Sequence, residues 1–275
     1  MQNLKIGVIG ATGQIGSHLI NALSNRENIS VCAFSRDITR AKNLLPDSIE
    51  IRQLDSLSPN SNIFNEINRI FWLVPDDQFR EAEWMDIVKQ SSLEKIVLLS
   101  SIHPEIFNLK SSEHFIKKTG IPYIILRPNT FMQNFNNFNH KSIVENNAFY
   151  YPASAGKTSF IDIRDIATAA EQCLVSENHQ NKIYTLTGEQ SLTYYNAAEI
   201  LSEAYGKTIR YIDTYERPDL DSENSSNEIW NHFFAGVRNN LFSEITPDLT
   251  SLLGHPARTF TQYANDYWKN RTATI

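Results

Sequence analysis

The sequence has 275 residues, of which 41% are hydrophobic and 20% charged, and its formal net charge is −6 at pH 7. A chain of this length and apolar content can build a substantial core, which excludes a disordered or collagen-like protein. The acidic balance and the scattered basic residues argue against nucleic acid and anionic membranes as partners. Two distant cysteines and seven histidines without paired spacing predict neither a disulfide framework nor a metal site. The apolar runs are at most five residues long, so we expect a cytoplasmic protein without a signal sequence or a membrane span.

Glycine is scarce in the chain but concentrated at its start. Of ten glycines, four lie within the first sixteen residues, namely Gly7, Gly10, Gly13 and Gly16. An apolar strand pattern at residues 5–9 precedes the last three, and apolar side chains at helical spacing follow them. A strand, a G-x-x-G-x-x-G turn and a helix in this order are typical of a loop that binds the diphosphate of a dinucleotide. We expect the first glycine to form the turn, the second to admit the phosphates and the third to pack against the sheet.

Strand and helix patterns alternate over the first 130 residues. The predicted strands cover residues 5–9, 30–34, 49–54, 70–74, 96–99 and 123–126. The first predicted helix follows the glycine turn, and the others cover residues 39–45, 79–90 and 112–119. This alternation predicts a doubly wound α/β domain at residues 1–130, with a mostly parallel sheet and a ligand site at the carboxyl ends of the strands.

The pattern from residue 131 to residue 275 is mixed. It predicts a smaller substrate lobe that packs against the sheet and contributes partly to it. Short strands are expected near Phe149 and Phe160 and at residues 182–186 and 209–212, and helices at residues 165–175, 193–205, 229–241 and 259–269. Residues 216–228 are acidic, rich in Ser and Asn and without periodicity, which predicts a mobile connector.

The end of the second predicted strand indicates which dinucleotide would bind. NAD-binding proteins carry an acidic residue about twenty positions after the glycines, whereas this strand leads into Ser35 and Arg36. Ser35 leaves room for a 2′-phosphate, and the planar guanidinium of Arg36 can bind it. Asp37 is either a helix cap or a group that faces the ribose. We therefore expect NADP(H) in preference to NAD(H).

The end of the fifth predicted strand carries two hydroxyl groups but no recognisable proton donor. Ser100 and Ser101 there could form a turn or orient a substrate. A Tyr-x-x-x-Lys dyad, in which the lysine lowers the pKa of the tyrosine, is missing from the sequence, because none of the eleven tyrosines has a lysine four residues later. The next predicted helix carries Lys110, Glu113 and His114 instead, and we interpret these three residues as a solvated face.

Five segments together resemble the NmrA-like, atypical branch of the short-chain dehydrogenase/reductase family. They are GATGQIG, VLLSS, GIPYIILRPNTFMQN, FIDIRDIA and YTLTGEQSLTYYNAAEILSEAYG, and the similarity extends from Leu4 to about Trp268. Within this branch the sequence looks most like reductases related to festuclavine dehydrogenase and to NAD(P)H:quinone reductase. The resemblance implies a Rossmann fold, oxidoreductase activity and an NAD(P) site.

The resemblance also assigns coenzyme contacts by position. The diphosphate would be bound by Gly10, Thr12, Gly13, Gln14 and Ile15, together with Gly16. The adenosine ribose would be bound by Ser35 and Arg36, and the adenine would lie near Asp55. The nicotinamide would be flanked by Leu73, Pro75 and Ser100.

Residues that follow the last main strand are the candidates for the substrate site. Phe131 and Phe138 could supply an apolar wall, and Asn134 lies between them in the sequence. Ser101, Asn129 and Asn134 are the candidates for orienting the acceptor.

Three functions fit these features. The first is an NADPH-dependent reductase of a small electron-poor acceptor, an iminium, quinone or conjugated carbonyl, since such acceptors can take a hydride without a protein acid. The resembled family also contains non-enzymatic redox sensors, so an NADP(H)-sensing regulator is the alternative, and a non-redox cyclase or isomerase is the third. An open apolar cleft would favour the reductase, and a cleft filled by side chains would favour the sensor. A small molecule is the expected partner, and the sequence leaves the oligomeric state open.

Overall fold

The structure is a computed structural model that describes residues 4–55, 60–73, 81–216 and 228–269. The chain divides into two compact units. Unit 1 comprises Met1–Arg127 and Ile166–Tyr184, and unit 2 comprises Pro128–Asp165 and Thr185–Ile275. The division follows residue 127 rather than residue 130, and residues 166–184 belong with the amino-terminal part of the chain.

Unit 1 is built on a sheet of seven strands in the order β3-β2-β1-β4-β5-β6-β9. These strands are β1 (Leu4–Ile9), β2 (Ile29–Ser35), β3 (Glu50–Gln53), β4 (Arg69–Leu73), β5 (Lys95–Leu99), β6 (Tyr123–Pro128) and β9 (Lys182–Leu186), the last of which extends into unit 2. Neighbours from β3 to β6 pair in parallel. The predicted doubly wound α/β fold is therefore confirmed, and its strand order reverses between β1 and β4, where such sheets bind ligands.

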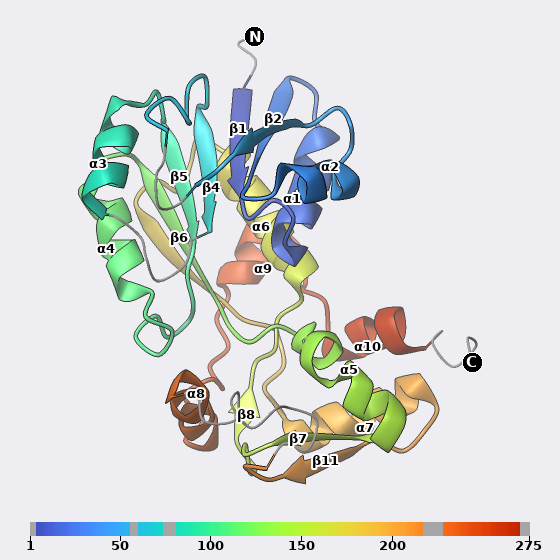
Figure 1. Cartoon of the computed structure of the whole chain (residues 1–275). Coiled ribbons are helices and arrows are strands. Elements are labelled where there is room, and N and C mark those ends of the chain that lie inside the picture. Colours follow the sequence, from blue (N-terminus) through green and yellow to red (C-terminus); the bar gives the residue numbers. More distant parts are fainter. Residues whose placement is uncertain (1–3, 56–59, 74–80, 217–227, 270–275) are drawn as a thin grey trace. The chain divides into compact units, whose positions relative to one another are not determined.

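Helices cover both faces of this sheet. They are α1 (Gln14–Ser24), α2 (Ile38–Leu44), α3 (Glu81–Gln90), α4 (Lys110–Lys118) and α6 (Ile163–Val175). Figure 1 shows α3 and α4 on one face and α1 and α6 on the other. Trp72 of β4 and Trp84 of α3 are buried against each other, with ring centroids 5.4 Å apart, so both belong to the core.

Unit 2 combines two small sheets with five helices in its described part. β7 (Ala148–Tyr151) pairs in parallel with β11 (Arg210–Asp213), and β8 (Lys157–Thr158) pairs antiparallel with β10 (Leu192–Thr193). The helices are α5 (Asn134–Asn146), α7 (Tyr194–Tyr205), α8 (Glu228–Arg238), α9 (Asp248–Leu253) and α10 (Phe260–Trp268). None of the helices in the described ranges of either unit is long and apolar enough to cross a membrane.

Candidate functional site

The glycine turn at the carboxyl end of β1 is tightly packed at two of its three glycines. Gly10 has a φ of +79°, which L side chains rarely adopt, and a Cβ there would lie 2.6 Å from Cδ2 of Leu73. A Cβ on Gly16 would lie 2.2 Å from the carbonyl oxygen of Gly10 and 2.9 Å from Cα of Ala11. The first turn of α1 therefore rests on the backbone of the turn itself. The atoms nearest to a Cβ on the third glycine thus belong to the turn that directly follows β1, and its packing against the sheet stays a prediction.

Gly13 leaves the amino terminus of α1 open to a ligand. It is exposed and precedes α1 as its N-cap, with no side chain to bond the first turn. A Cβ on Gly13 would meet one described heavy atom within 4 Å, the carbonyl oxygen of Gly10 at 3.1 Å. Within α1, which is described throughout, the first turn contains no acidic residue. The positive end of the helix dipole is thus not neutralised by an acidic residue in the first turn of α1, an arrangement that fits a diphosphate.

The residues assigned to the diphosphate differ in exposure. Thr12 is half-buried, Gln14 is exposed and Ile15 is buried. A buried side chain at Ile15 means that this residue could contact a phosphate through its backbone N–H rather than its side chain. The part played by each residue stays a prediction.

The carboxyl end of β2 forms a short turn that settles the structural role of Asp37. The Ser35 hydroxyl donates to the carbonyl oxygen of Asp37 at 3.0 Å and accepts from its N–H at 3.2 Å. Oδ1 of Asp37 accepts a hydrogen bond from the N–H of Arg40 at 2.9 Å, so Asp37 is the N-cap of α2. Arg36 is exposed between these two turn residues. The Asp37 carboxylate is thus hydrogen-bonded to the first turn of α2, and the Arg36 side chain lies at the surface.

The adenosine end of the predicted site also includes the residue after β3. The N–H of Leu54 donates to the carbonyl oxygen of Ser35 at 2.9 Å, which places the ends of β2 and β3 side by side. Asp55 follows directly and is exposed. Ser35, Arg36 and Asp55 therefore share one edge of the sheet, as the assignment to ribose and adenine requires.

A buried carboxylate lies at the carboxyl ends of β5 and β6. Glu113 of α4 is 3% exposed. Its Oε1 accepts hydrogen bonds from the Ser100 hydroxyl at 2.7 Å and from Nε of Arg127 at 2.8 Å, and its Oε2 accepts from Nη2 of Arg127 at 2.6 Å. Burial acts to raise the pKa of this carboxyl, but the hydrogen bonds from Arg127 and Ser100 outweigh it and hold the pKa below its ordinary value of 4.5. Glu113 is therefore ionised at neutral pH.

This carboxylate corrects the interpretation of α4. Lys110 and His114 are exposed, as a solvated face requires, but Glu113 points inward, so the assignment of Glu113 to a solvated face is wrong.

The residues at the nicotinamide end of the predicted site are less enclosed. Leu73, the last residue of β4, is 38% exposed, and Ser101 is half-buried. Pro75 lies outside the described residues.

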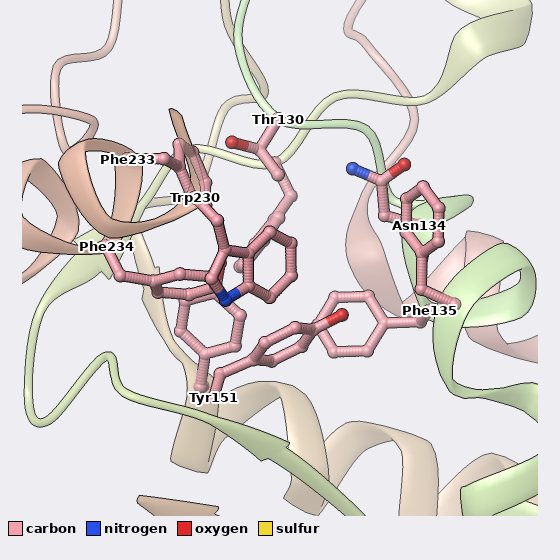
Figure 2. Close-up of a pocket in the computed structure, with 10 residues that line it drawn as sticks. Thr130, Asn134, Phe135, Tyr151, Trp230, Phe233 and Phe234 are labelled. Carbon is pink, nitrogen blue, oxygen red and sulfur yellow. The ribbon is translucent and has the colours of Figure 1, made fainter. Parts of the chain in front are cut away.

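Unit 2 contains a small cavity with an aromatic lining (Figure 2), formed by residues of α5, α7, α8 and the strands beside them. The lining residues are Thr130, Asn134, Phe135, Phe138, Tyr151, Phe160, Tyr194, Trp230, Phe233 and Phe234. None of these described residues is charged. The cavity volume is about 40 Å³, enough for a few water molecules.

Three side chains of α8, those of Trp230, Phe233 and Phe234, form one wall of this cavity. The Trp230 ring lies 4.7 Å from the Phe234 ring and 5.6 Å from the Tyr151 ring, measured between centroids. Figure 2 shows the Trp230 indole between these rings and Asn134, which projects from the start of α5. Nδ2 of Asn139 donates a hydrogen bond to the Tyr151 hydroxyl. The cavity thus combines aromatic rings with a few neutral polar groups.

The candidate substrate residues separate into two groups. Asn134 and Phe138 line the cavity, and Phe138 is 54% exposed. Phe131 lies outside the lining and forms a parallel β-bridge with Ile161. Asn129 is buried, and its amide donates to the Ser159 hydroxyl at 2.6 Å and to the carbonyl oxygen of Phe242 at 2.8 Å. These bonds occupy the Asn129 amide within the fold, so we do not propose it for orienting an acceptor.

The aromatic residues of α8 were not expected from the sequence to form part of a site. A helix at residues 229–241 is predicted correctly apart from its end, but Trp and Phe at helical spacing indicate core packing more often than a pocket. Across the described ranges, no cluster of three His, Cys, Asp or Glu residues is placed to hold a metal ion.

Comparison with known proteins supports the coenzyme assignment. A family model described as NAD(P)H-binding matches residues 10–176. The Prestalk A differentiation protein A of Dictyostelium discoideum is 26% identical, with 98% of this chain and 95% of its own length aligned. The NAD(P)H azoreductase of Xenophilus azovorans is 27% identical, with 94% of this chain and 96% of its own length aligned.

Solved structures with the same fold include both an enzyme and a regulator. The triphenylmethane reductase of Citrobacter sp. superposes with a TM-score of 0.83 at 23% identity, covering 96% of this chain and 100% of the other. NmrA, a negative transcriptional regulator solved in complex with NADP, superposes with a TM-score of 0.78 at 15% identity, covering 100% of this chain and 99% of the other. At these identities the likeness shows the fold alone.

Proposed function

Because the chain belongs to the NAD(P)H-binding family, we propose that it is an NADPH-dependent reductase of small, planar, electron-poor acceptors. The observation that carries this proposal is the aromatic lining of the unit 2 cavity, in which aromatic side chains and neutral polar groups border one space. Flat apolar walls suit a planar acceptor, and the hydroxyl and amide groups of Thr130 and Asn134 could orient its heteroatoms. The names of the azoreductase and the triphenylmethane reductase, two similar proteins, point to dyes as acceptors of the same kind.

The lining also favours one charge type among these acceptors. The faces of aromatic rings carry partial negative charge and attract cations, and delocalised cations bind well between such rings. The formal net charge of the chain, −6, acts in the same direction. We therefore propose that cationic acceptors, such as iminium ions and cationic dyes, are preferred over sulfonated, anionic ones.

NADPH is the coenzyme that we propose for this reaction, and when bound it supplies a hydride. The glycine turn and the amino terminus of α1 would hold its diphosphate, and Arg36 would bind its 2′-phosphate. The cap formed by Asp37 supports this choice, since its carboxylate is bonded to α2 rather than presented to a ribose.

The ionised Glu113 supports a reaction without a protein acid. Its pKa lies below 4.5, so this carboxylate has no proton to donate at neutral pH. A reduced iminium is a neutral amine, and a reduced quinone is a stabilised oxyanion that water can protonate. The chain then has to bind the acceptor, orient it and exclude water, and it need not transfer a proton.

The small cavity is the observation that favours the second candidate, an NADP(H)-sensing regulator. Ligand sites for drug-sized molecules measure about 300–1,000 Å³, far above the roughly 40 Å³ of this cavity. A reductase must therefore move Trp230 or its neighbours on binding an acceptor. A sensor needs no such space.

A turnover screen separates the two functions. The wild-type chain would be titrated with NADPH and NADH, and coenzyme oxidation would be followed with a quinone, a cyclic iminium, a cationic triarylmethane dye and a sulfonated azo dye. We expect NADPH oxidation with the iminium and the cationic dye to be fastest. Tight NADPH binding without oxidation by any acceptor would favour the sensor, and failure to bind either coenzyme would contradict both functions.

A further inference from the structure

Ser100, Glu113 and Arg127 form a cluster that the proposed reaction does not use directly, and we name it the Glu113 clamp. The fork of Arg127 holds both carboxylate oxygens of Glu113, and Ser100 bonds to one of them. A bidentate guanidinium contact fixes the plane of a carboxylate more strictly than a single bond does. Nζ of Lys117 lies 3.9 Å from Oε2 and adds a second positive charge. The clamp is therefore a rigid support for the Ser100 hydroxyl.

The charge of Glu113 determines the direction of the hydrogen bond with Ser100. An ionised carboxylate can accept but cannot donate, so the single hydroxyl hydrogen of Ser100 must point at Glu113. The lone pairs of the Ser100 oxygen then remain for another group, toward which Ser100 can act as an acceptor alone. A free serine would adapt to a donor or an acceptor, whereas this one selects a donor.

Ser100 lies at the same edge of the sheet as the glycine turn. It follows Leu99, which pairs with Leu73 of the adjacent strand β4, and the Leu73 side chain occupies the space into which a Cβ on Gly10 would project. The N–H of Ser100 donates to the carbonyl oxygen of Leu126 at 2.8 Å, which fixes its backbone. The hydroxyl is thus held at the carboxyl ends of the strands, where the sheet would bind its coenzyme.

We propose that Glu113 is a positioning residue that keeps Ser100 as a hydrogen-bond acceptor for the carboxamide N–H of the nicotinamide. This inference rests on the proposed coenzyme binding. The carboxamide is the one N–H donor at that end of the coenzyme, and it is present in both the oxidised and the reduced form. A hydrogen bond from the carboxamide to Ser100 would restrain the rotation of the nicotinamide about its glycosidic bond and so favour one face of the ring.

Equilibrium binding tests the inference without an acceptor. NADP⁺ would be compared with its 3-acetylpyridine analogue, in which a methyl ketone replaces the carboxamide, so that the charge is kept and the N–H donors are lost. We expect the wild-type chain to bind NADP⁺ about 10-fold more tightly than the analogue, a preference equivalent to about 1.4 kcal/mol.

Two variants should abolish this preference. Ser100→Ala removes the acceptor and leaves the Glu113–Arg127 pair in place. Glu113→Gln can turn its amide N–H toward Ser100 and so force the hydroxyl to donate outward, which suits the ketone better than the carboxamide. We expect the ratio of the affinity for NADP⁺ to the affinity for the analogue to be near one for Ser100→Ala and one or below for Glu113→Gln. Ser112→Ala, which removes another buried hydroxyl of α4, should keep the wild-type ratio.

The outcomes separate this inference from the proposed function. A wild-type chain that binds NADP⁺ and the analogue equally, or a folded Ser100→Ala variant that keeps the wild-type ratio, would overturn the role of the clamp whether or not the chain turns over an acceptor. The expected ratios in a chain without turnover would support the clamp and contradict the reductase. If Glu113→Gln fails to fold, as judged by circular dichroism, Ser100→Ala carries the test.

Discussion

Gly13 and Gly16 belong to the same turn, but a methyl group would meet different surroundings at each. At Gly16 it would overlap the backbone of Gly10 at 2.2 Å, so the turn or the helix must shift. We expect Gly16→Ala to lower the free energy of unfolding by about 1–3 kcal/mol, as overpacking does. At Gly13 the nearest atom is at 3.1 Å and φ is −81°, so Gly13→Ala should fold nearly as well as wild type.

Coenzyme titration completes this comparison. The methyl group of Gly13→Ala would occupy the space in which a phosphate would bind, so this variant should bind NADPH at least 10-fold more weakly while its thermal midpoint falls little. Thermal unfolding and fluorescence titration measure the two effects. A Gly13→Ala variant with wild-type affinity would contradict the diphosphate site.

Arg36 should discriminate between the two coenzymes. We expect Arg36→Ala to weaken NADPH binding about 10- to 100-fold and to leave NADH binding unchanged, because a charge-assisted contact to the 2′-phosphate is worth about 1.5–3 kcal/mol. Lys89→Ala on α3 removes the same charge from another element and serves as the control. Equal losses of NADPH and NADH affinity in Arg36→Ala would show that the 2′-phosphate assignment is wrong.

At the scale of residues, the sequence predicts a site well where the signal is local. The glycine spacing, the Ser35–Arg36 pair and the cap at Asp37 all lie within a few positions of each other. The signal for Glu113 is not local, since its partners lie 13 residues away at Ser100, directly after β5, and 14 residues away at Arg127 of β6. Exposed charges on both sides of it, at Lys110 and Lys117, made a solvated face the simplest interpretation.

Among the elements, α4 is attached to β6 by the Glu113–Arg127 pair, and this attachment should depend on pH. The pKa of Glu113 is lower in the folded chain than in the unfolded chain. The ionised carboxylate therefore contributes fully to stability above the pKa of the unfolded chain, and this contribution is lost as the pH falls through the pKa of the folded chain. We expect Glu113→Gln to lower the free energy of unfolding at pH 7 by roughly 2–4 kcal/mol. The difference from wild type should shrink between pH 5 and pH 3.

Urea unfolding of both chains across this pH range provides the measurement. Glu203→Gln, an exposed change on α7, serves as the control and should show no such trend. A stability difference that stays constant down to pH 3 would mean that folding does not shift the pKa of Glu113.

The carboxyl end of α6 is held by two buried cations from the amino ends of β4 and β5. Nη1 of Arg69 donates to the carbonyl oxygens of Leu174 at 2.8 Å and Val175 at 3.1 Å, and Nζ of Lys95 donates to those of Cys173 at 3.3 Å and Ser176. Positive charge at a helix carboxyl end is stabilising, and these carbonyl groups are otherwise left without a donor from the helix.

Arg69→Met should therefore loosen α6 without affecting the coenzyme. We expect a loss of about 2–3 kcal/mol in the free energy of unfolding, together with faster amide exchange in the last turn of α6. NADPH affinity should not change, because Arg69 begins β4 and the glycine turn lies at the opposite end of the sheet. Hydrogen exchange by mass spectrometry would detect the local effect, and unchanged exchange there would contradict the capping role.

Element prediction succeeded for segments with a clear apolar period and failed for α5. The buried residues of α5 are Phe135, Asn139, Ser142 and Ile143, so half of its inner face is polar and no apolar stripe is present. Its buried Asn139 bonds to Tyr151, a residue of β7. A helix whose inner face satisfies hydrogen bonds of another element cannot be recognised from its own hydrophobic pattern.

For the whole molecule, the division into units could not be predicted from the order of the elements. The chain passes between the units three times, after residues 127, 165 and 184. The sequence pattern assigns everything after residue 130 to the smaller lobe, because the alternation of strands and helices ends there. α6 nevertheless contributes fully buried residues to unit 1, among them Ile166, Ala170 and Leu174.

A fragment of residues 1–130 should therefore fail to fold cooperatively. It would lack α6, leave the side chains that α6 covers in contact with water, and deprive Arg69 and Lys95 of the carbonyl groups to which they donate. We expect the fragment to bind a hydrophobic dye, to unfold over a broad temperature range and to bind NADPH weakly. Joining residues 1–127 to residues 166–184 through a flexible Gly/Ser linker should restore a cooperative transition and coenzyme affinity. Calorimetry of the two fragments measures this difference, and a sharp transition in residues 1–130 alone would show that α6 is dispensable for unit 1.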